Sequence, residues 1–286
     1  MNPNLKALYG LKYNPFAPDL PLDALHLSEK LEDFAWRIEH GLAHEGGFAL
    51  ITGEPGTGKS VALRVLAERL GRLREVSVGC LEHPQSNLAD FYREMGDLFG
   101  VALRPHNRWG GFRVLREKWL MHIDTTLIRP ILLIDEAQEM HPSVLNELRI
   151  LSSTRFDSRS ILSVVLAGDR RLLHKLRRDE LLPLGSRIRT RLLLEPATSE
   201  ELRSGVMHLM QAAGNAKLMT RELIETLCDH ALGNYRMLST LANELLSVAA
   251  QRQLDVLDEK LYLEVFAAPK TARETPRRTA NRSPRE

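Results

Sequence analysis

The sequence of 286 residues contains little cysteine, few aromatic residues and no long hydrophobic run. Its two cysteines, Cys80 and Cys228, lie far apart and show neither metal-ligand spacing nor a disulfide framework, which indicates two reduced thiols and a cytosolic protein. Residues 1–16 contain no apolar segment of the kind that forms a secretion signal. The best apolar run, Ile161–Ala167, is much shorter than the roughly 20 residues that cross a membrane. These absences favour a soluble, cytoplasmic protein with no membrane partner.

The overall composition is that of a folded globular chain, and its charge does not decide whether it binds nucleic acid. Hydrophobic residues make up 43% and charged residues 27% of the sequence, which excludes wholesale disorder. The formal net charge is +2, but residues 268–286 alone carry six Lys and Arg residues against two Glu residues. The rest of the chain is slightly acidic, so any contact with nucleic acid must come from a local basic patch.

Short apolar segments alternate with longer segments of helical periodicity between residues 48 and 194. This alternation predicts an α/β fold with a five-stranded parallel sheet flanked by helices. The apolar segments are nearly continuous, as in strands that are buried on both faces. The predicted strands are Phe48–Thr52, Glu75–Leu81, Ile131–Asp135, Ile161–Ala167 and Arg189–Leu194. The predicted helices are Ser60–Leu70, Asn87–Phe99, Gly111–Ile123 and Ser143–Ser152.

The pattern changes after Pro196, because only helical periodicity follows. Thr198 and Glu201 have the spacing of a capping box, and Gly214 is suited to end the helix that they begin. The last 19 residues lack apolar periodicity. We therefore expect an N-terminal segment of residues 1–20, an α/β domain of residues 21–196, a small all-helical domain of residues 197–267 and a basic disordered tail of residues 268–286.

Residues 53–60 match the phosphate-binding pattern G-x-x-x-x-G-K-[ST], after a predicted strand and before a predicted helix, as this pattern requires. Its glycines let backbone N–H groups surround phosphates, and the helix N-terminus adds a positive dipole. The pattern predicts an ATP site with Mg²⁺, in which Lys59 reaches the β- and γ-phosphates and Ser60 binds the metal. The residues of this P-loop are Gly53, Glu54, Pro55, Gly56, Thr57, Gly58, Lys59 and Ser60.

Two neighbouring carboxylates, Asp135 and Glu136, follow the apolar segment Ile131–Ile134. In phosphoryl transfer at a P-loop, an acidic residue at the end of such a strand completes the Mg²⁺ shell, and a second one orients the attacking water. We assign Asp135 to the metal and Glu136 to the water.

Two later features are weaker when they are taken alone. Asp169 follows the fourth predicted strand and is suited either to sense the γ-phosphate or to form a turn beside Gly168. Arg187, Arg189 and Arg191 alternate along the last strand, a pattern typical both of phosphoryl-charge stabilisation by arginine and of a solvated strand face.

Further short segments complete a recognisable order along residues 9–267. They are Tyr9-Gly10-Leu11, Asn14-Pro15-Phe16, the P-loop, Ile134-Asp135-Glu136-Ala137-Gln138, residues 145–152, Leu166-Ala167-Gly168-Asp169, Ser186-Arg187-Ile188 and Gly233-Asn234-Tyr235-Arg236. In this order the segments resemble those of AAA+ ATPases of the ExeA, TniB and TnsC type.

The resemblance implies an AAA+ module with a helical lid, whose ATP lies between subunits of a homo-oligomer. By matching positions, Asp169 corresponds to sensor 1, Arg187 to the arginine finger that acts on a neighbouring subunit, and Arg236 to sensor 2 on the lid. Pro15 and Phe16 are then expected near the adenine. An acid at the position of Asp169 repels the γ-phosphate unless Mg²⁺ or an arginine compensates its charge.

Two branches of this family imply different biology. ExeA-type secretion ATPases continue into a membrane span and a peptidoglycan-binding domain, and this sequence ends at Glu286 with a basic tail. We therefore favour the transposition-regulator branch, to which MuB-like proteins belong. Its members form ATP-dependent rings or helical filaments on double-stranded DNA and recruit or stimulate a transposase. Such a protein is expected at the bacterial nucleoid. The alternatives are a secretion or envelope-assembly ATPase without DNA binding, and a DNA scaffold gated by nucleotide that hydrolyses ATP slowly.

A basic stretch at residues 101–119 agrees with DNA binding without sequence specificity, because it carries five cationic residues against Glu117 alone. A solvated amphipathic helix would show the same pattern. A second basic stretch at residues 170–191 is suited to a subunit interface or to DNA. The predicted phosphate contacts of the first stretch are Arg104, Arg108, Arg113, Arg116 and Lys118.

Overall fold

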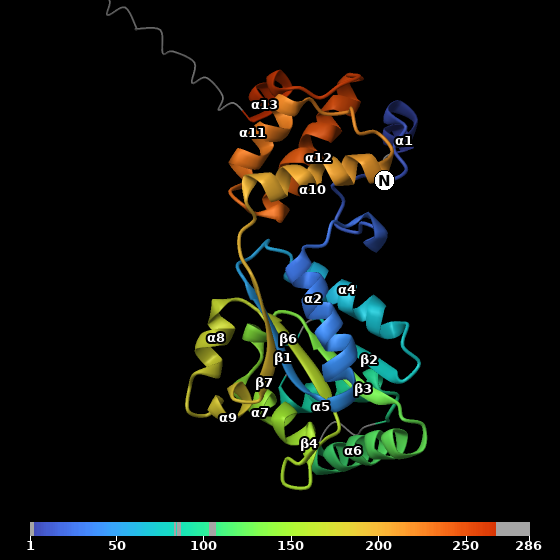
Figure 1. Cartoon of the computed structure of the whole chain (residues 1–286), viewed down its shortest axis with the longest axis vertical. Coiled ribbons are helices and arrows are strands. Elements are labelled where there is room, and N and C mark those ends of the chain that lie inside the picture. Colours follow the sequence, from blue (N-terminus) through green and yellow to red (C-terminus); the bar gives the residue numbers. More distant parts are fainter. Residues whose placement is uncertain (1–2, 83, 85–86, 103–106, 267–286) are drawn as a thin grey trace, which may run out of the picture.

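The computed structural model describes residues 3–82, 84, 87–102 and 107–266. Five parallel strands form its central sheet, in the order β2-β3-β6-β1-β7 (Figure 1). The expected five-stranded parallel sheet is therefore confirmed. Strand β6 separates the strand that leads into the P-loop, β1, from the strand that leads into the acidic pair, β3. The strands are β1 (Gly47–Gly53), β2 (Val76–Leu81), β3 (Arg129–Ile134), β6 (Ser163–Gly168) and β7 (Ile188–Leu194).

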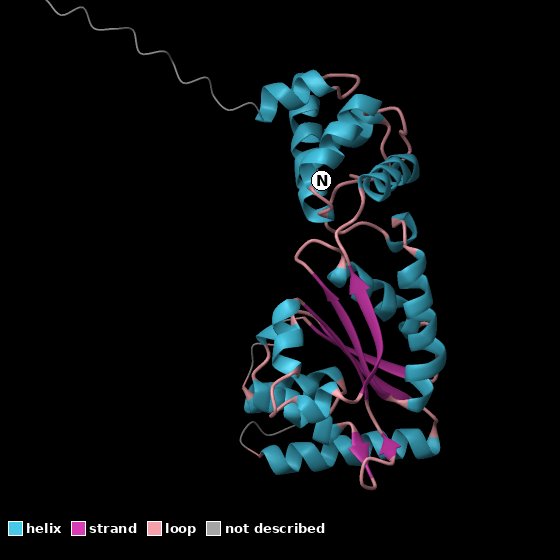
Figure 2. Ribbon diagram, turned by 60° about the vertical axis from the view of Figure 1, so that its left-hand side comes forward, coloured by secondary structure: helices cyan, strands magenta, loops and turns pink. Residues whose placement is uncertain are grey.

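Helices cover both faces of this sheet, because its strands alternate large apolar side chains between the two faces (Figure 2). In β1, Phe48 and Leu50 belong to one hydrophobic cluster, whereas Ala49 and Ile51 belong to the other. The second face is covered by α2 (Glu29–Arg37) and α4 (Lys59–Gly71). The first face is covered by α5 (Leu88–Leu98), α6 (Arg108–Thr125), α7 (Pro142–Leu151), α8 (Arg170–Leu176) and α9 (Leu182–Gly185).

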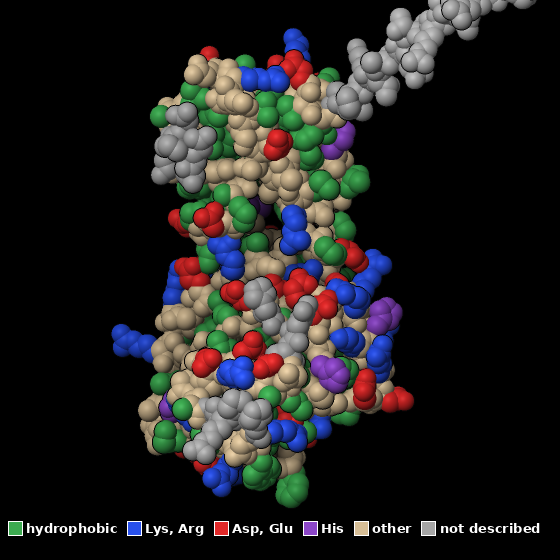
Figure 3. Space-filling view, turned by 180° about the vertical axis from the view of Figure 1, so that it is seen from behind, with side chains coloured by type: hydrophobic (Ala, Val, Ile, Leu, Met, Phe, Trp, Pro, Cys, Tyr) green, Lys and Arg blue, Asp and Glu red, His purple; other side chains and the backbone are tan. Residues whose placement is uncertain are grey.

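A separate helical lid follows the sheet and has a hydrophobic core of its own. The predicted capping box is present, since the Thr198 hydroxyl accepts the Glu201 N–H and the Glu201 carboxylate accepts the Thr198 N–H. Helix α1 (Pro3–Tyr9) contributes Leu5 and Tyr9 to the core of the lid. Figure 3 shows a narrow waist where the lid meets the α/β core. The lid consists of α10 (Ser199–Ala213), α11 (Arg221–Ala231), α12 (Tyr235–Arg252) and α13 (Glu259–Phe266).

Sequence reasoning missed several short elements. The most prominent is a two-stranded hairpin between α7 and β6, built from β4 (Ser153–Thr154) and β5 (Arg159–Ser160). It shortens the predicted strand Ile161–Ala167, because Ile161 N and Leu162 N both donate to Ser152 O, and β6 begins only at Ser163. The other missed elements are α8, α9, α1, α2, α3 (Ala43–Glu45), the 3₁₀ turns η1 (Leu22–Ala24) and η3 (Ala137–Glu139), and the π-helical turn η2 (Ile38–Leu42).

None of the helices within the described residues has the length and apolar character needed to span a membrane. Arg104 and the tail at residues 268–286 lie outside the described residues.

Candidate nucleotide site

The P-loop joins the end of β1 to the start of α4, and its backbone requires glycine. Gly56 and Gly58 have φ angles of +84° and +102°, which side-chain-bearing residues rarely adopt. A side chain at Gly56 would also collide with the lid, since an added Cβ would lie 2.0 Å from Asn234 Oδ1. The Thr57 hydroxyl donates to Glu54 O at 2.8 Å and closes the turn. Glycine geometry, the lid contact and this hydrogen bond therefore define the shape of the loop.

Lys59, the first residue of α4, is buried with 6% of its surface exposed. Its ammonium group donates to Gly53 O and Glu54 O, each at 3.1 Å. These two hydrogen bonds compensate for the burial of the ammonium group, which has no carboxylate partner among the described residues. Phosphate oxygens are stronger acceptors for an ammonium group. Ser60 follows on the exposed side of the same helix start.

The acidic pair follows β3 at the same edge of the sheet. Asp135 N donates to Leu81 O at 3.0 Å, and Asp135 Oδ1 accepts the N–H of Glu136 at 2.9 Å. Glu136 has a φ angle of +48°, a left-handed conformation that costs a residue with a side chain about 1 to 2 kcal/mol. Such strain persists only where surrounding contacts enforce it, and it concentrates at functional sites.

Gln138 supplies one of those contacts. Its side chain is 98% buried, its amide nitrogen donates to Glu136 Oε2, and its amide oxygen accepts the N–H of Asp169 at 3.2 Å. Gly168 leaves room for it, since a Cβ there would lie 2.6 Å from Gln138 Oε1. Gln138 thus links the loop after β3 to the loop after β6. The sequence shows Gln138 only as the last residue of the segment Ile134–Gln138, because no local pattern indicates which residues its amide contacts.

Asp169 caps the N-terminus of α8. Its carboxylate accepts the backbone N–H of Arg171 at 2.8 Å and the Arg171 Nε at 2.9 Å. The hydrogen bond to this carboxylate raises the pKa of the Arg171 guanidinium. Arg171 therefore supplies a compensating positive charge beside an acid at this position. Its neighbour Arg170 forms an ion pair with Glu54 of the P-loop.

The lid touches the P-loop directly. Asn234 Nδ2 donates to Pro55 O and the backbone N–H of Tyr235 donates to Gly56 O, both at 3.1 Å. Asn234 also caps α12 through its Oδ1, which accepts the N–H of Met237 at 3.0 Å. Arg236 occupies the second position of the same helix and is exposed. The first turn of α12 is therefore fixed against the phosphate-binding loop.

A comparison with known protein families agrees with this geometry. Residues 42–176 match the family described as "AAA domain". The match runs from the end of η2 to the end of α8, so it includes the P-loop, the acidic pair and Asp169. The AAA+ part of the expected resemblance is thereby supported for residues 42–176.

The chain is also similar to individual proteins. It is 29% identical over 248 residues to "General secretion pathway protein A" of Aeromonas hydrophila, which covers 85% of this chain and 44% of that protein. This chain thus spans less than half the length of that relative. In fold, it is similar to Cdc6p from Pyrobaculum aerophilum, with a TM-score of 0.69, 17% identity and coverage of 85% and 67% of the two chains. Its fold is also similar to that of a chain of Drosophila ORC bound to DNA, with a TM-score of 0.65 and 17% identity. That match covers 92% of this chain and 65% of the ORC chain.

The N-terminal segment runs from the lid to the α/β core. Pro15 and Phe16 are buried, and Phe16 belongs to the hydrophobic core of the lid. Arg64 on α4 donates to Pro18 O at 3.2 Å and to Leu20 O at 2.6 Å. The segment therefore connects the lid with the helix that begins at Lys59. Whether Pro15 and Phe16 contact adenine stays a prediction.

Arg187 lies at the opposite end of the sheet from the P-loop. It directly precedes β7, and Ile188 is paired with Phe48 near the start of β1, whereas the P-loop follows the end of β1. The seven residues of β1 span roughly 20 Å at about 3.3 Å per residue. An arginine side chain does not bridge that distance. Arg187 therefore does not reach the P-loop of its own chain.

The predicted DNA contacts at residues 108–118 are mostly engaged within the chain. Arg108 pairs with the buried Glu147. Arg116 donates to Ile150 O at 2.9 Å, at the end of α7, and Lys118 donates to Phe99 O at 2.6 Å, after α5. Arginine and lysine often stabilise helix C-termini in this way. In the described structure the cationic groups of these three residues hold helices together, and their contact with DNA stays a prediction. Arg113, in an exposed pair with Glu117 at 3.5 Å, remains a candidate.

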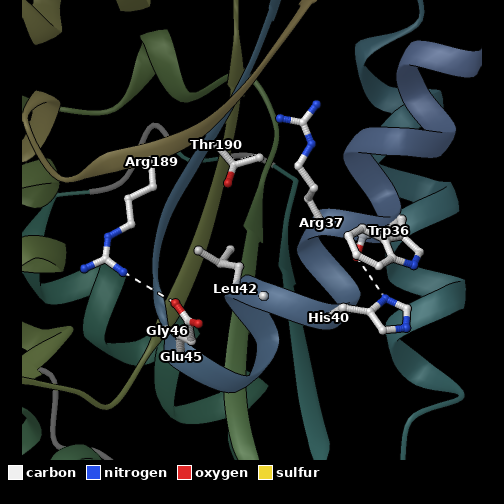
Figure 4. A pocket seen from close by; sticks show the side chains of 9 residues that line it. Trp36, Arg37, His40, Leu42, Glu45, Gly46, Arg189 and Thr190 are labelled. Atoms are coloured by element: carbon white, nitrogen blue, oxygen red, sulfur yellow. Dashed lines mark hydrogen bonds and ion pairs between the residues drawn. The ribbon is translucent and has the colours of Figure 1, made fainter.

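A pocket of about 350 Å³ lies near the amino ends of β1 and β7 (Figure 4). Trp36 stacks on His40 with ring centroids 4.7 Å apart, and Arg189 pairs with Glu45 at 3.6 Å. Because Gly46 of this pocket precedes β1 and the P-loop follows β1, the two sites lie at opposite ends of the strand. The pocket is thus distinct from the phosphate-binding loop.

Proposed function

We propose that the protein is an ATPase whose active sites form between neighbouring subunits of a homo-oligomer. The observation that carries this proposal is that Lys59, the acidic pair and Asp169 all follow the carboxyl ends of parallel strands, and that Gln138 links Glu136 to Asp169. Arg187 lies at the other end of the sheet, which supports its action on the nucleotide of a neighbour. The site of one chain is then complete only in an assembly.

The residues around the P-loop fit ATP with Mg²⁺. Backbone N–H groups at the start of α4 bind phosphates, and Lys59 exchanges its carbonyl partners for phosphate oxygens. The Ser60 hydroxyl and the Asp135 carboxylate are hard oxygen donors, as Mg²⁺ prefers, and a site with one or two protein ligands is usual where phosphates supply the rest. The bound metal neutralises charge on the phosphates. Glu136 orients the attacking water and accepts its proton, while Gln138 holds the Glu136 carboxylate in place.

Mixing two inactive variants tests the composite site. Glu136→Gln lacks the water-orienting carboxylate, and Arg187→Ala lacks the arginine that acts on the neighbour. Each variant alone is expected to hydrolyse ATP poorly, and a mixture is expected to regain activity at interfaces that combine an intact Glu136 with an intact Arg187. Arg189→Ala is the matched control, since Arg189 is an exposed arginine of β7, two positions after Arg187. No recovery on mixing, with mixed oligomers present by crosslinking, would contradict the proposal.

We further propose that ATP controls binding to double-stranded DNA, and that the assembly, a ring or a helical filament, regulates transposition by recruiting or stimulating a transposase. In that role the protein works in the bacterial cytoplasm at the nucleoid. The sequence resemblance supports this assignment, and so does the similarity of fold to an ORC chain bound to DNA. Exposed arginines without an ion-pair partner in the described structure are available for phosphates. Arg155, Arg177 and Arg178 are among them.

Fluorescence anisotropy of a labelled random-sequence duplex tests this second step, with an ATP analogue, with ADP and without nucleotide. Binding is expected to require the analogue, to weaken with salt and to be lost in Lys59→Ala. Replacing Arg177 and Arg178 by Ser is expected to reduce the salt slope by about two, one for each lost phosphate contact. Arg221→Ser on the lid is the control. Unchanged slopes would remove these two arginines from the interface.

The second candidate is a secretion-type ATPase that acts on a protein partner. The 29% identity to General secretion pathway protein A favours it, although the match covers only 44% of that protein. The same anisotropy titration separates the two functions. An absence of duplex binding in every nucleotide state, with ATP hydrolysis intact, would favour the secretion candidate.

A further inference from the structure

The hairpin between α7 and β6 has an unusual tip. Three consecutive residues, Arg155, Phe156 and Asp157, have positive φ angles of 51°, 55° and 66°. Residues with a side chain adopt this conformation at an energetic cost, so a run of three must be held by other contacts. The Phe156 side chain between them is fully exposed. The strained tip therefore projects into solvent and does not pack against the core.

Asp157 provides the main contacts that hold this tip. One of its carboxylate oxygens accepts the Ser153 hydroxyl, and the other accepts the guanidinium of Arg187. These hydrogen bonds lower the pKa of the Asp157 carboxyl, with Ser153 first and Arg187 second among the causes, so Asp157 is ionised at neutral pH. Arg187 also donates to Pro183 O and is 29% exposed. The arginine that we assign to a neighbour's nucleotide is therefore already bound to an anion of its own chain.

The base of the hairpin is fixed independently of this contact. Arg159 on β5 forms an ion pair with Asp124 at the end of α6. The N–H groups of Ile161 and Leu162 donate to Ser152 O, at 2.7 and 3.3 Å. The hairpin is thus anchored at its base and strained at its tip, and the position of the tip sets where the Asp157 carboxylate meets Arg187.

We infer that Asp157 restrains Arg187 in the free subunit, and that Arg187 exchanges this carboxylate for the phosphates of a neighbouring subunit's nucleotide when the assembly forms. This inference rests on the proposed trans action of Arg187. A carboxylate and a phosphate compete for the same guanidinium donors, and the pairing with Asp157 neutralises the charge that phosphoryl transfer requires. Asp157 is accordingly a positioning residue that lowers activity until a neighbour is present. A movement of the exposed hairpin tip would release the arginine.

Asp157→Asn in the full-length chain tests the restraint. The asparagine is neutral and nearly isosteric, so it removes the ionic attraction to Arg187 whichever way its amide is turned, while Ser153 can pair with either the amide oxygen or the amide N–H₂ group. We expect kcat for ATP hydrolysis to rise about two- to five-fold, the effect of releasing one partly exposed ion pair. The KM for ATP should stay unchanged, because the P-loop is not altered. Ser153→Ala, which removes only the hydrogen bond that orients the carboxylate, should give a smaller rise in the same direction.

Two controls separate this restraint from a structural role of the hairpin. Asp124→Asn removes the ion pair at the hairpin base without touching Arg187, and its kcat should equal that of the wild type. The double variant Asp157→Asn with Arg187→Ala should be as inactive as Arg187→Ala alone, because the restraint acts only through that arginine. Thermal denaturation of each variant checks that it is folded.

The possible failures are distinguishable. If Arg187→Ala hydrolyses ATP as fast as the wild type, the proposed trans action of Arg187 is wrong. If Arg187→Ala is inactive but folded Asp157→Asn has wild-type or lower kcat, the restraint is wrong and the proposed function stands. An equal rise in Asp124→Asn would also overturn the inference, because it would show that any loosening of the hairpin suffices.

Discussion

The two ends of the sheet hold their polar side chains in different ways. At the carboxyl ends, the partners are close in sequence, as Lys59 bonds to carbonyls five and six positions away and Glu136 bonds to Gln138 two positions away. At the amino ends, Arg187 is held by Asp157, which is 30 positions away on a separate hairpin. The charged groups of Lys59 and Glu136 are thus held by local contacts, whereas the ion pair of Arg187 depends on a distant segment of the chain. The first arrangement is suited to bind nucleotide within one chain, and the second to respond to a neighbouring chain.

The strongest test of the carboxyl end is Glu136→Gln. Removing a group that accepts a proton in the transition state is expected to lower kcat by about 10²- to 10⁴-fold. Nucleotide affinity should stay within about two-fold, since Glu136 does not hold the phosphates before the reaction. Steady-state hydrolysis together with equilibrium binding of a fluorescent ATP analogue measures both quantities. A loss of binding equal to the loss of turnover would contradict the assignment of Glu136 to the water.

Lys59→Ala should reduce nucleotide binding itself. Losing one charge-assisted contact of about 1.5 to 3 kcal/mol corresponds to roughly 10- to 150-fold weaker binding. Isothermal titration calorimetry with an ATP analogue measures the change. Lys30→Ala provides a control, because Lys30 is an exposed lysine paired with Glu195 on the surface. An affinity unchanged in Lys59→Ala would mean that its ammonium group keeps its carbonyl partners when nucleotide is bound.

Gln138→Leu tests the link between the loops after β3 and β6. Leucine fills a similar volume but cannot hold the Glu136 carboxylate or accept the N–H of Asp169. We expect kcat to fall about tenfold or more, as for the loss of a hydrogen bond to a charged group, with little change in KM. A merely structural role would lower thermal stability and leave kcat of the folded fraction intact. That result would mean that Gln138 stabilises the fold but does not position the Glu136 carboxylate for hydrolysis.

The smallest effect is expected at the other end of the sheet. Trp36→Ala opens the pocket near the amino ends of β1 and β7 but leaves the P-loop untouched. ATP affinity should therefore remain within about two-fold of the wild type, and only contacts made by the pocket should change. The calorimetric titration used for Lys59→Ala measures this directly. A larger change in affinity would show that the two ends of the sheet are coupled within one chain.

The lid shows both kinds of contact, one local and one tertiary. The capping box at Thr198 and Glu201 could be predicted from the spacing of two residues, because a cap is satisfied within one turn of helix. The contact of Asn234 with Pro55, 179 positions away, could not. Glycine is required at position 56 for a local reason and for a tertiary one. The P-loop turn demands a positive φ there, and the lid leaves no room for a Cβ.

The basic stretch at residues 108–118 shows where sequence reasoning reaches its limit. Cationic side chains that bind DNA and cationic side chains that cap helices have the same spacing along a helix, because both face away from the core. Only the tertiary structure decided that Arg116 and Lys118 donate to the backbone ends of α7 and α5. The buried Glu147, which binds both Arg108 and Tyr92, gave no local signal either.

By itself, the sequence determined the parallel sheet, the P-loop and the position of the acidic pair. Continuous apolar strands, glycines in a fixed pattern and carboxylates after a strand are local features, and parallel strands bring their carboxyl ends to one edge. The tertiary structure alone decided that Gln138 joins two of those loops, that the lid rests on the P-loop, and that Arg187 pairs with Asp157. These contacts unite residues far apart in the chain, and their energies depend on how helices and a hairpin pack, which no short stretch of sequence specifies.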